Sequence, residues 1–438
     1  MNNISKFILL FVFMTNCSFH DGSKFWTKEI IKKDSPQKEK KLKTEKIFVK
    51  EEALNLEFNP SLKISLYSKA INKSFLNNYD NNNGRINYNG DLKNISRFKF
   101  KKIDNFYEYN PIISFENDNI IFFDNKGSIL KFDNNSNLIW KKNYYSKSEQ
   151  KQKPVLLLAN NKKVLIVADN IAKYYALDIN TGELLWSKEN TAPFNSQIKI
   201  YKDKFFVIDL KNTLKSYSIK NGNEIWNIKT ENTLIRTQKK LSMVIVDKKI
   251  YFNNSLGDIS SVDIASGQLL WQSPTQSSLV YDEGFFLQNS EIIADKNNLY
   301  FSNNKNQFFS IDINTGIINW QQKINSNLRS TLIDNYIFTV SLEGYLIIIE
   351  KDSGNIIRST DIFKNFKLKK RAKIKPVGFI VGLNNIYLTT DNGKLLIIDT
   401  VTGITSSVLK IDNDKISRPS VLNKNLYIIK DSSIIKLD

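Results

Sequence analysis

The stretch ALDINTGELLW, residues 176–186, contains the pattern that decides the fold of this chain. An apolar β-type run ends at Leu177, turn-forming residues follow, and an apolar run resumes after Gly182. Gly182 supplies the positive φ of a tight turn, and Asp178 and Thr181 can bond neighbouring backbone amides. Trp186 is too large to bury within one small sheet, so we expect it to pack against a neighbouring unit.

The same pattern recurs along most of the chain, in seven copies. Their successive separations, measured at the Trp position, are 46, 40, 45, 49, 38 and 49 residues, which is typical of a four-stranded propeller blade and not of a helical solenoid. Ser136 stands in the Gly place of the first copy, and Arg358 and Ser407 stand in the Trp place of the last two. The repeated residues are Trp140, Gly182, Trp186, Gly222, Trp226, Gly267, Trp271, Gly316, Trp320, Gly354 and Gly403.

Beyond the seventh turn the chain continues with three apolar runs, at 418–422, 426–429 and 434–437, with no turn-and-Trp segment after them. The missing fourth strand can come from residues 98–102, inside the alternating segment 95–103. A ring closed in this way ties both ends together and leaves no dangling sheet edge. We therefore predict an all-β fold, an eight-bladed β-propeller of four-stranded antiparallel blades, closed by an N-terminal strand that completes the last blade.

The net charge of +19 invites a nucleic-acid hypothesis, because a basic face tracks phosphates. Only seven of the 63 basic residues are Arg, the Lys residues are scattered over every repeat, and Asn and Ile are similarly abundant. This pattern indicates a compositional bias of an A+T-rich coding sequence, so we predict no nucleic-acid partner.

The repeats contain neither Cys nor His, since Cys17 and His20 both precede them. This excludes from the repeats Cys nucleophiles, His bases, Ser-His-Asp triads and zinc sites built on Cys or His. Asp and Glu remain, so a carboxylate-only mechanism or a calcium site stays open.

Residues 1–16 are predicted to be a signal peptide, with Lys6 followed by an apolar run too short to span a membrane. The run stops at Cys17, and this resembles a bacterial lipoprotein signal, in which the Cys is lipidated; the alternative is an ordinary signal peptide with an incidental Cys. Residues 17–55 then form a lipidated N-terminus and a flexible Lys/Glu-rich tether, or else a helix on the domain. Residues 56–94 are an irregular Asn-rich lead-in, and 95–438 are the propeller.

The form A-x-D-x-x-T-G-x-x-x-W, complete at residues 176–186, resembles the repeat of the quinoprotein-type propellers. That superfamily contains pyrroloquinoline quinone (PQQ) dehydrogenases and the BamB-like lipoproteins of outer-membrane protein assembly. A lipoprotein signal followed by one eight-bladed domain resembles the BamB-like family over about residues 75–438.

The BamB resemblance implies a non-enzymatic scaffold without a cofactor, anchored by lipid alone to the periplasmic face of the outer membrane. Ser18 after the Cys also resembles lipoproteins sent there. The implied partners are the POTRA region of a BamA-like barrel-assembly protein, other members of the assembly machinery, and unfolded outer-membrane proteins, whose insertion the scaffold assists. The alternatives are a PQQ-dependent dehydrogenase-like enzyme, for which the chain has no second Cys, and a generic ligand-binding propeller.

The same resemblance places partner contacts at the start of a blade, within residues 230–240. Leu234, Ile235 and Arg236 match the family's arrangement of an apolar pair followed by Arg. An exposed apolar pair beside a forked cation is a suitable binding hot spot, although an Arg bonded within the propeller would give the same sequence. Asp282 and Glu283 stand where the family has a second, acidic contact loop, in a register that departs from the pattern.

Overall fold

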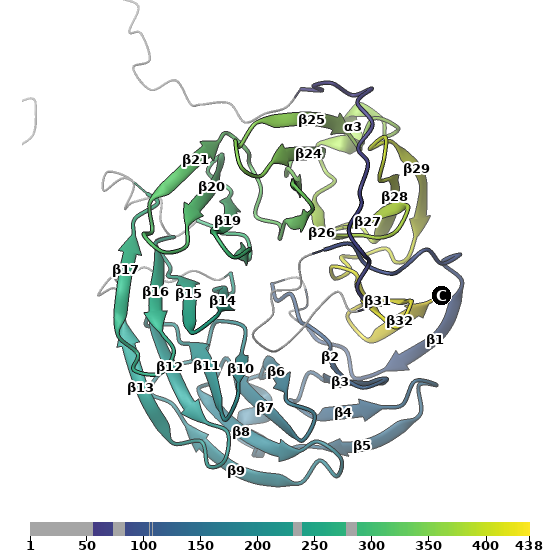
Figure 1. The fold of residues 1–438 in the computed structure, drawn as a ribbon. Helices are drawn as coiled ribbons and strands as arrows, with labels where there is room; N and C mark the ends of the chain where they lie inside the picture. Colours follow the sequence, from purple (N-terminus) through teal and green to yellow (C-terminus); the bar gives the residue numbers. More distant parts are fainter. Residues whose placement is uncertain (1–55, 73–83, 105, 107, 231–238, 277–286) are drawn as a thin grey trace, which may run out of the picture. The chain divides into compact units, whose positions relative to one another are not determined.

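The computed structural model describes residues 56–72, 84–104, 106, 108–230, 239–276 and 287–438 (Figure 1). These residues all belong to one contact unit, Glu51–Asp438, and nearly all of its regular structure is strand. Among them are eight antiparallel sheets of four strands, and within each sheet the strands run in sequence order except at the ring closure. The sheets follow one another around a ring, as the fold prediction requires (Figure 1).

In each of the first four blades the inner strand is the shortest of the four. Their strands are β2 (Ser114–Glu116), β3 (Asn119–Phe123), β4 (Ile129–Phe132), β5 (Leu138–Lys142); β6 (Leu156–Asn160), β7 (Val164–Asp169), β8 (Lys173–Asp178), β9 (Leu184–Glu189); β10 (Lys199–Tyr201), β11 (Lys204–Ile208), β12 (Thr213–Ser218), β13 (Glu224–Lys229); β14 (Met243–Val246), β15 (Lys249–Asn253), β16 (Ile259–Asp263) and β17 (Leu269–Ser273).

Blades 5 to 8 also have four strands each. Among the described residues two short helices lie between blades, α2 (Lys147–Lys151) before β6 and α3 (Leu368–Arg371) before β26. Their strands are β18 (Ile293–Ala294), β19 (Asn298–Asn303), β20 (Gln307–Asp312), β21 (Ile318–Gln322); β22 (Thr331–Ile333), β23 (Tyr336–Val340), β24 (Tyr345–Glu350), β25 (Ile356–Asp361); β26 (Pro376–Val381), β27 (Asn385–Thr390), β28 (Lys394–Asp399), β29 (Thr405–Lys410); β30 (Ser420–Leu422), β31 (Asn425–Ile429), β32 (Ser433–Leu437) and β1 (Asn94–Lys99).

The last blade closes the ring as predicted, in the order β1-β32-β31-β30. Phe98, which is fully buried, pairs with Ile434. The closing strand was expected at 98–102 and instead spans Asn94–Lys99. The ladder ends at Lys99; the next amide, of Phe100, donates to the Ser432 carbonyl at 3.1 Å, and the Phe100 ring packs on Phe122 of blade 1, 4.8 Å between centroids.

The repeated Trp residues lie against the turn of the next blade. An added Cβ on Gly222 would stand 2.6 Å from ring carbons of Trp186, and the Trp186 indole N–H donates to the Ile219 carbonyl at 2.8 Å. The packing expected for Trp186 is therefore confirmed. The same ring-on-glycine contact joins Trp140 to Gly182, Trp226 to Gly267, Trp271 to Gly316 and Trp320 to Gly354.

A bulge in each outer strand orients this side chain. Ala176 pairs with Trp186 while the next residue, Leu177, pairs with Leu184, so Leu185 is an extra residue on the outer strand. Register shifts at the corresponding place occur in the other third-to-fourth strand pairs of blades 1 to 7. A bulge bends and twists the strand locally, and here it brings the Trp side chain onto the adjacent blade.

Arg358 takes the Trp position between blades 6 and 7. It is fully buried, and its guanidinium lies 2.9 Å from where a Cβ on Gly403 would be. Nη1 donates to the Val401 carbonyl, and to the Leu62 carbonyl at 2.8 Å. The lead-in segment, through the antiparallel bridge between Phe58 and Ser359, covers this place. Burial lowers the pKa of the Arg358 guanidinium to about 10, with the Asp399 carboxylate opposing the shift.

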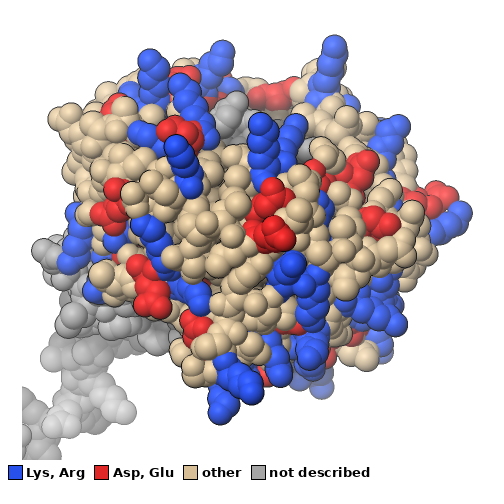
Figure 2. Space-filling model, turned by 90° about the horizontal axis from the view of Figure 1, so that it is seen from below, with Lys and Arg blue, Asp and Glu red and all other residues tan. Residues whose placement is uncertain are grey.

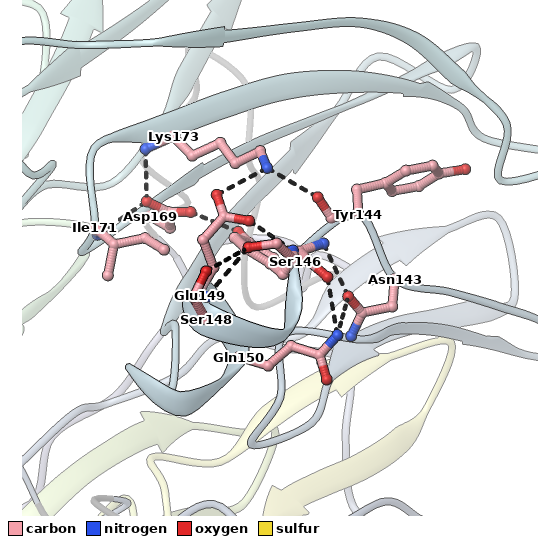
Figure 3. Close-up of polar contacts among 10 residues, drawn as sticks. Asn143, Tyr144, Ser146, Ser148, Glu149, Gln150, Asp169, Ile171 and Lys173 are labelled. Carbon is pink, nitrogen blue, oxygen red and sulfur yellow. Dashed lines mark hydrogen bonds and ion pairs between the residues drawn. The ribbon is translucent and has the colours of Figure 1, made fainter.

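In blades 1, 2 and 3 a buried carboxylate holds the turn between the second and third strands, namely Asp124, Asp169 and Asp209; Figure 3 shows Asp169. Asp169 is fully buried and accepts the Tyr145 hydroxyl at 2.5 Å and the amides of Ile171 and Lys173 at 2.9 and 2.8 Å. The Lys173 ammonium in turn donates to Glu149 of α2 at 3.0 Å. Burial raises the pKa of the Asp169 carboxyl to about 6, against the effect of these donors.

We predict that Gly222→Ala lowers the unfolding free energy by about 2 to 4 kcal/mol, because the new methyl group displaces Trp186 in addition to straining a backbone at φ 68°. Gly84→Ala is the control. It has φ 112° but meets only Ile71, at 4.0 Å, so we expect the strain cost alone, about 1 to 2 kcal/mol. Chemical denaturation measures both, and equal losses would mean that the Trp contact contributes nothing.

We also predict a pH signature for Asp169. Its pKa is higher in the folded protein than the value of 3.8 expected when unfolded, so between about pH 4 and 6 the folded state binds more protons. Its contribution to stability is therefore present below that window and lost as the pH rises through it. Relative to Asp169→Asn, wild type should lose up to about 3 kcal/mol of unfolding free energy between pH 4 and 7.

We expect the opposite pH dependence of stability for Asp133→Asn, because hydrogen bonds from Asn137 and the Asn135 amide lower the pKa of the Asp133 carboxyl. Wild type should there gain stability relative to the variant as the pH rises. Parallel pH profiles of wild type and Asp169→Asn would show that Tyr145 and the two amides hold the carboxylate ionised at its ordinary pKa.

Candidate functional site

The two faces of the ring carry different connections. Because strands within each sheet are antiparallel, the second-to-third turns and the connections from each outer strand to the next inner strand share one face, called here the connection face. The third-to-fourth turns, with the repeated Gly residues, lie on the other face. The longer connections of the ring are therefore all on the connection face, which makes it the first place to look for binding residues.

Both predicted contact segments belong to outer-to-inner connections by their place in the chain. Leu234, Ile235 and Arg236 fall between β13 and β14, and Asp282 and Glu283 fall between β17 and β18. All five lie outside the described residues, as does Cys17. Their contacts therefore stay predictions.

The described end of the first connection is bonded to blades on other sides of the ring. The Lys239 ammonium donates to the Asn327 carbonyl, in front of blade 6, and the Lys240 ammonium donates to the Asn110 carbonyl, in front of blade 1, at 3.0 Å. Leu241 is 1% exposed, and its amide donates to the Asn195 carbonyl at 2.7 Å. Three neighbouring residues thus fix this end against three other blades.

The second connection is fixed on both sides of its undescribed part. Before it, the Gln276 amide group donates to Gln307 at 2.8 Å. After it, the Gln288 backbone amide donates to Asn304 Oδ1 at 2.8 Å, and Leu287 is 3% exposed.

A serine marks the entry to the inner strand in three blades and sets the direction of the next side chain. Each hydroxyl accepts the amide of a second-strand residue twelve positions later and donates to the carbonyl of the residue that follows it. The pairs are Ser196 with Ile208 at 2.8 Å, Ser290 with Ser302 at 2.9 Å and Ser417 with Ile429 at 2.9 Å. Gln197, Glu291 and Arg418 thereby occupy equivalent positions in blades 3, 5 and 8.

The side chains at these three equivalent positions lie near one another. The Glu291 carboxylate lies 3.4 Å from Nη1 of Arg329, which enters blade 6, and it interacts with Gln197, Lys199 and Arg418. Side chains from blades 3, 5, 6 and 8 can approach one another only at the middle of the ring. With the lysines that enter blades 4 and 8, they form what we call the central cluster: Gln197, Lys199, Lys239, Lys240, Glu291, Arg329, Lys415 and Arg418.

The electrostatics of the central cluster are dominated by burial of positive charge. Burial opposes ionisation of Glu291, but Arg329, Arg418, Gln197 and Lys199 outweigh it and lower the pKa of that carboxyl. Burial, with repulsion from Arg329, lowers the pKa of Arg418 to about 9.

Burial lowers the pKa values of the lysines of the central cluster as well. Burial lowers the pKa of Lys239 to about 7 and that of Lys240 to about 8, with Glu291 opposing both shifts. Burial also lowers the pKa of Lys415, against the effect of Asp391.

The central cluster was not foreseen from the sequence. Its one local signal is a Ser followed by Gln, Glu or Arg just before an apolar inner strand, at 196–197, 290–291 and 417–418. That these pairs face one another follows only from the ring.

Asp169 is the other group with a pKa suited to acid-base chemistry near neutral pH (Figure 3). It is fully buried, and its oxygens are bonded to Tyr145 and to turn amides. A substrate has no access to it, so Asp169 is a structural carboxylate.

Within the described ranges, no group of three or more His, Cys, Asp or Glu side chains is placed to hold a metal ion. The same ranges contain no helix with the length and apolar character that a bilayer crossing requires. On the face drawn in Figure 2, Lys and Arg side chains stand among Asp and Glu and do not form one continuous basic stripe.

Comparison with solved structures shows the fold. BamB from Moraxella catarrhalis superposes with a TM-score of 0.64 at 16% identity, over 79% of this chain and 99% of that one. The quinohemoprotein alcohol dehydrogenase of Comamonas testosteroni gives a TM-score of 0.60 at 9% identity, over 81% of this chain and 78% of that one. The computationally designed protein Ika8 gives a TM-score of 0.57 at 12% identity, over 77% of this chain and 99% of that one. No protein of curated function matches the sequence.

Sequence comparison supplies the family. Residues 125–360, more than half of the chain, match a single family, and the match runs from the end of the second strand of blade 1 to the outer strand of blade 6. It includes both connections in which the contact residues were predicted. The chain therefore belongs to the family described as outer membrane protein assembly factor BamB.

Proposed function

We propose that this protein is a periplasmic, outer-membrane-anchored lipoprotein scaffold of the β-barrel assembly machinery. In this role it binds the POTRA region of a BamA-like protein and assists the insertion of outer-membrane β-barrel proteins. The observation that carries the proposal is the family match over residues 125–360. A fold alone would not carry it, because propellers serve many functions.

The partner-binding role is assigned to Leu234, Ile235 and Arg236, with Asp282 and Glu283 as a second contact. Hydrogen bonds of the flanking residues support this assignment. Lys239 and Lys240, which follow the first segment, are bonded to residues in front of other blades. Gln276 and Gln288 are bonded on either side of the second segment. A contact segment whose ends are fixed loses less conformational entropy on binding. The apolar pair would desolvate a charge-assisted bond between Arg236 and a partner carboxylate.

The enzyme alternative rests on likeness of fold alone, at 9% identity to a quinohemoprotein dehydrogenase. The paired cysteines of such enzymes have no counterpart in a chain whose single Cys is Cys17. We therefore assign no catalytic step, cofactor or metal to the proposed function.

Arg236→Glu should weaken capture of the POTRA region by about 2 to 4 kcal/mol while leaving thermal unfolding nearly unchanged, because a surface charge reversal shifts stability by only about 0.5 kcal/mol. Binding is measured by biolayer interferometry on the purified partner region. The matched control is Arg97→Glu, the same reversal at an exposed position of β1 on the outer edge of blade 8, which should bind like wild type.

Two outcomes contradict the contact assignment. If the melting temperature of Arg236→Glu falls together with binding, the Arg is bonded within the propeller. If Arg236→Glu and Arg97→Glu bind equally well, residue 236 is not at the interface.

Cys17→Ser should abolish incorporation of labelled palmitate and leave soluble or uncleaved protein, because the thiol is the acylated group in the proposed lipoprotein. The control Thr15→Ala, beside the same position, should keep the label. Palmitate labelling of Cys17→Ser would remove lipid anchoring from the proposal without affecting the contact assignment.

A further inference from the structure

The connection between β25 and β26 concentrates positive charge on one part of the rim. Seven of the twelve residues 364–375, called here the basic connection, are Lys or Arg, and none of the twelve is Asp or Glu. Lys364 pairs with Glu57 at 3.3 Å, and Arg371 pairs with Asp361. The cations of the basic connection that form no ion pair with another described residue are Lys367, Lys369, Lys370, Lys373 and Lys375.

An exposed leucine stands among these cations. Leu368, the first residue of α3, is 79% exposed, and Lys367, Lys369 and Lys370 on either side of it are exposed as well. An apolar side chain surrounded by lysines is typical of segments that lie at a membrane interface. The apolar group enters the headgroup region, and the long lysine stems let the ammonium groups stay beside the lipid phosphates.

The base of the basic connection is fixed to the propeller. Ile374 is 3% exposed, and Phe366 packs against the core shared by blades 6 and 7. The Lys394 ammonium lies 4.6 Å from the centroid of the Phe366 ring, and the Lys375 backbone amide donates to Asp391 at 2.9 Å. The exposed leucine and lysines are therefore presented on a support that loses little conformational freedom on binding.

The predicted tether joins the propeller beside the basic connection. Phe58 and Ser359 of β25 exchange backbone hydrogen bonds of 3.0 and 2.9 Å, and the Glu57 carboxylate accepts the Asp361 amide at 3.3 Å. Figure 1 shows the lead-in passing beside α3. Residues 17–55 precede this contact in the chain, so a lipid anchor on the tether would connect the ring to the membrane at this point of its circumference.

We propose that the basic connection is a docking surface for an anionic lipid bilayer, with Leu368 inserted among the headgroups and the neighbouring lysines paired with lipid phosphates. A basic patch adds to the membrane affinity that a lipid group supplies, so the docking surface is a second membrane signal beside the anchor. The choice of a lipid surface as the occupant rests on the proposed lipoprotein, but the contact itself does not require the anchor.

The test is sedimentation of the full-length Cys17→Ser protein with vesicles of phosphatidylcholine alone, or of phosphatidylcholine and phosphatidylglycerol in equal parts. Neutral vesicles measure what the apolar run before residue 17 contributes, so the readout is the additional binding to anionic vesicles. This additional binding should be present, and it should fall as sodium chloride is raised, because salt screens the attraction.

Two variants in this background remove the charge and the apolar group separately. The triple variant Lys367→Gln, Lys369→Gln, Lys370→Gln should lower the additional binding at least about tenfold, because each lysine near an anionic surface raises affinity roughly fivefold. Leu368→Gln leaves the net charge unchanged and should lower the additional binding about threefold to tenfold, because the apolar insertion is lost.

The matched controls remove the same groups elsewhere. The triple variant Lys162→Gln, Lys163→Gln, Lys296→Gln neutralises three exposed lysines in the first-to-second strand turns of blades 2 and 5. Ile317→Gln removes an apolar side chain that is 65% exposed in blade 5. Both controls should bind anionic vesicles like the Cys17→Ser background, and circular dichroism melts show whether each variant keeps its fold.

The proposal is overturned if anionic vesicles bind no more protein than neutral ones. It is equally overturned if the two triple variants lose binding by the same factor, because the effect is then the general attraction of a basic protein for anions. If the variants at 367–370 instead weaken capture of the POTRA region and leave vesicle binding unchanged, the basic connection contacts a protein and not a lipid. Palmitate labelling of wild type reports on the anchor alone, so failure of the anchor and failure of the docking surface are distinguishable.

Discussion

The contact on which the rest of the structure depends is the indole ring of one blade lying on the glycine turn of the next. Glycine is required there because any Cβ would overlap the ring. In Trp140, Trp186, Trp271 and Trp320 a hydrogen bond from the indole N–H to a carbonyl of the next blade also fixes the position of the ring. Each blade is too thin to have a core of its own. The buried apolar clusters are shared between neighbouring sheets, as between Ala176 of blade 2 and Phe205 of blade 3.

This constraint explains which parts of the structure were predictable. A Gly followed four residues later by Trp encodes both halves of the inter-blade contact locally, so the count of blades, their strand order and the ring closure follow from the spacing. The closing strand begins four residues before the expected start because residues from Asn94 on pair with β32, and it ends at Lys99, next to the contact of Phe100 with blade 1; no local pattern contains either contact. The sequence shows that Arg358 stands in a Trp position, but it does not show that Arg358 is buried beneath the lead-in segment.

The central cluster shows where sequence reasoning stops. Gln197 and Arg418 are more than 200 residues apart and interact with one carboxylate only because the ring brings the entries of blades 3 and 8 to a common axis. No periodicity signals such a meeting, since each residue alone resembles an ordinary polar residue before a strand. The contact residues at 234–236 and 282–283 are the opposite case: a family pattern names them, and their geometry lies outside the described residues.

Closure through the first strand also sets the order in which the domain can assemble. β1 leaves the ribosome and any export channel early, yet its only partner in the sheet is β32, whose last residue is the penultimate residue of the chain. The pairing of Asn94 with Leu437 is a contact of very high sequence separation, and such contacts form slowly. Until β32 has been made, β1 and β31 each present an unpaired edge, so the nascent chain is open to proteolysis and mispairing there for as long as the segment between β1 and β32 is being synthesised.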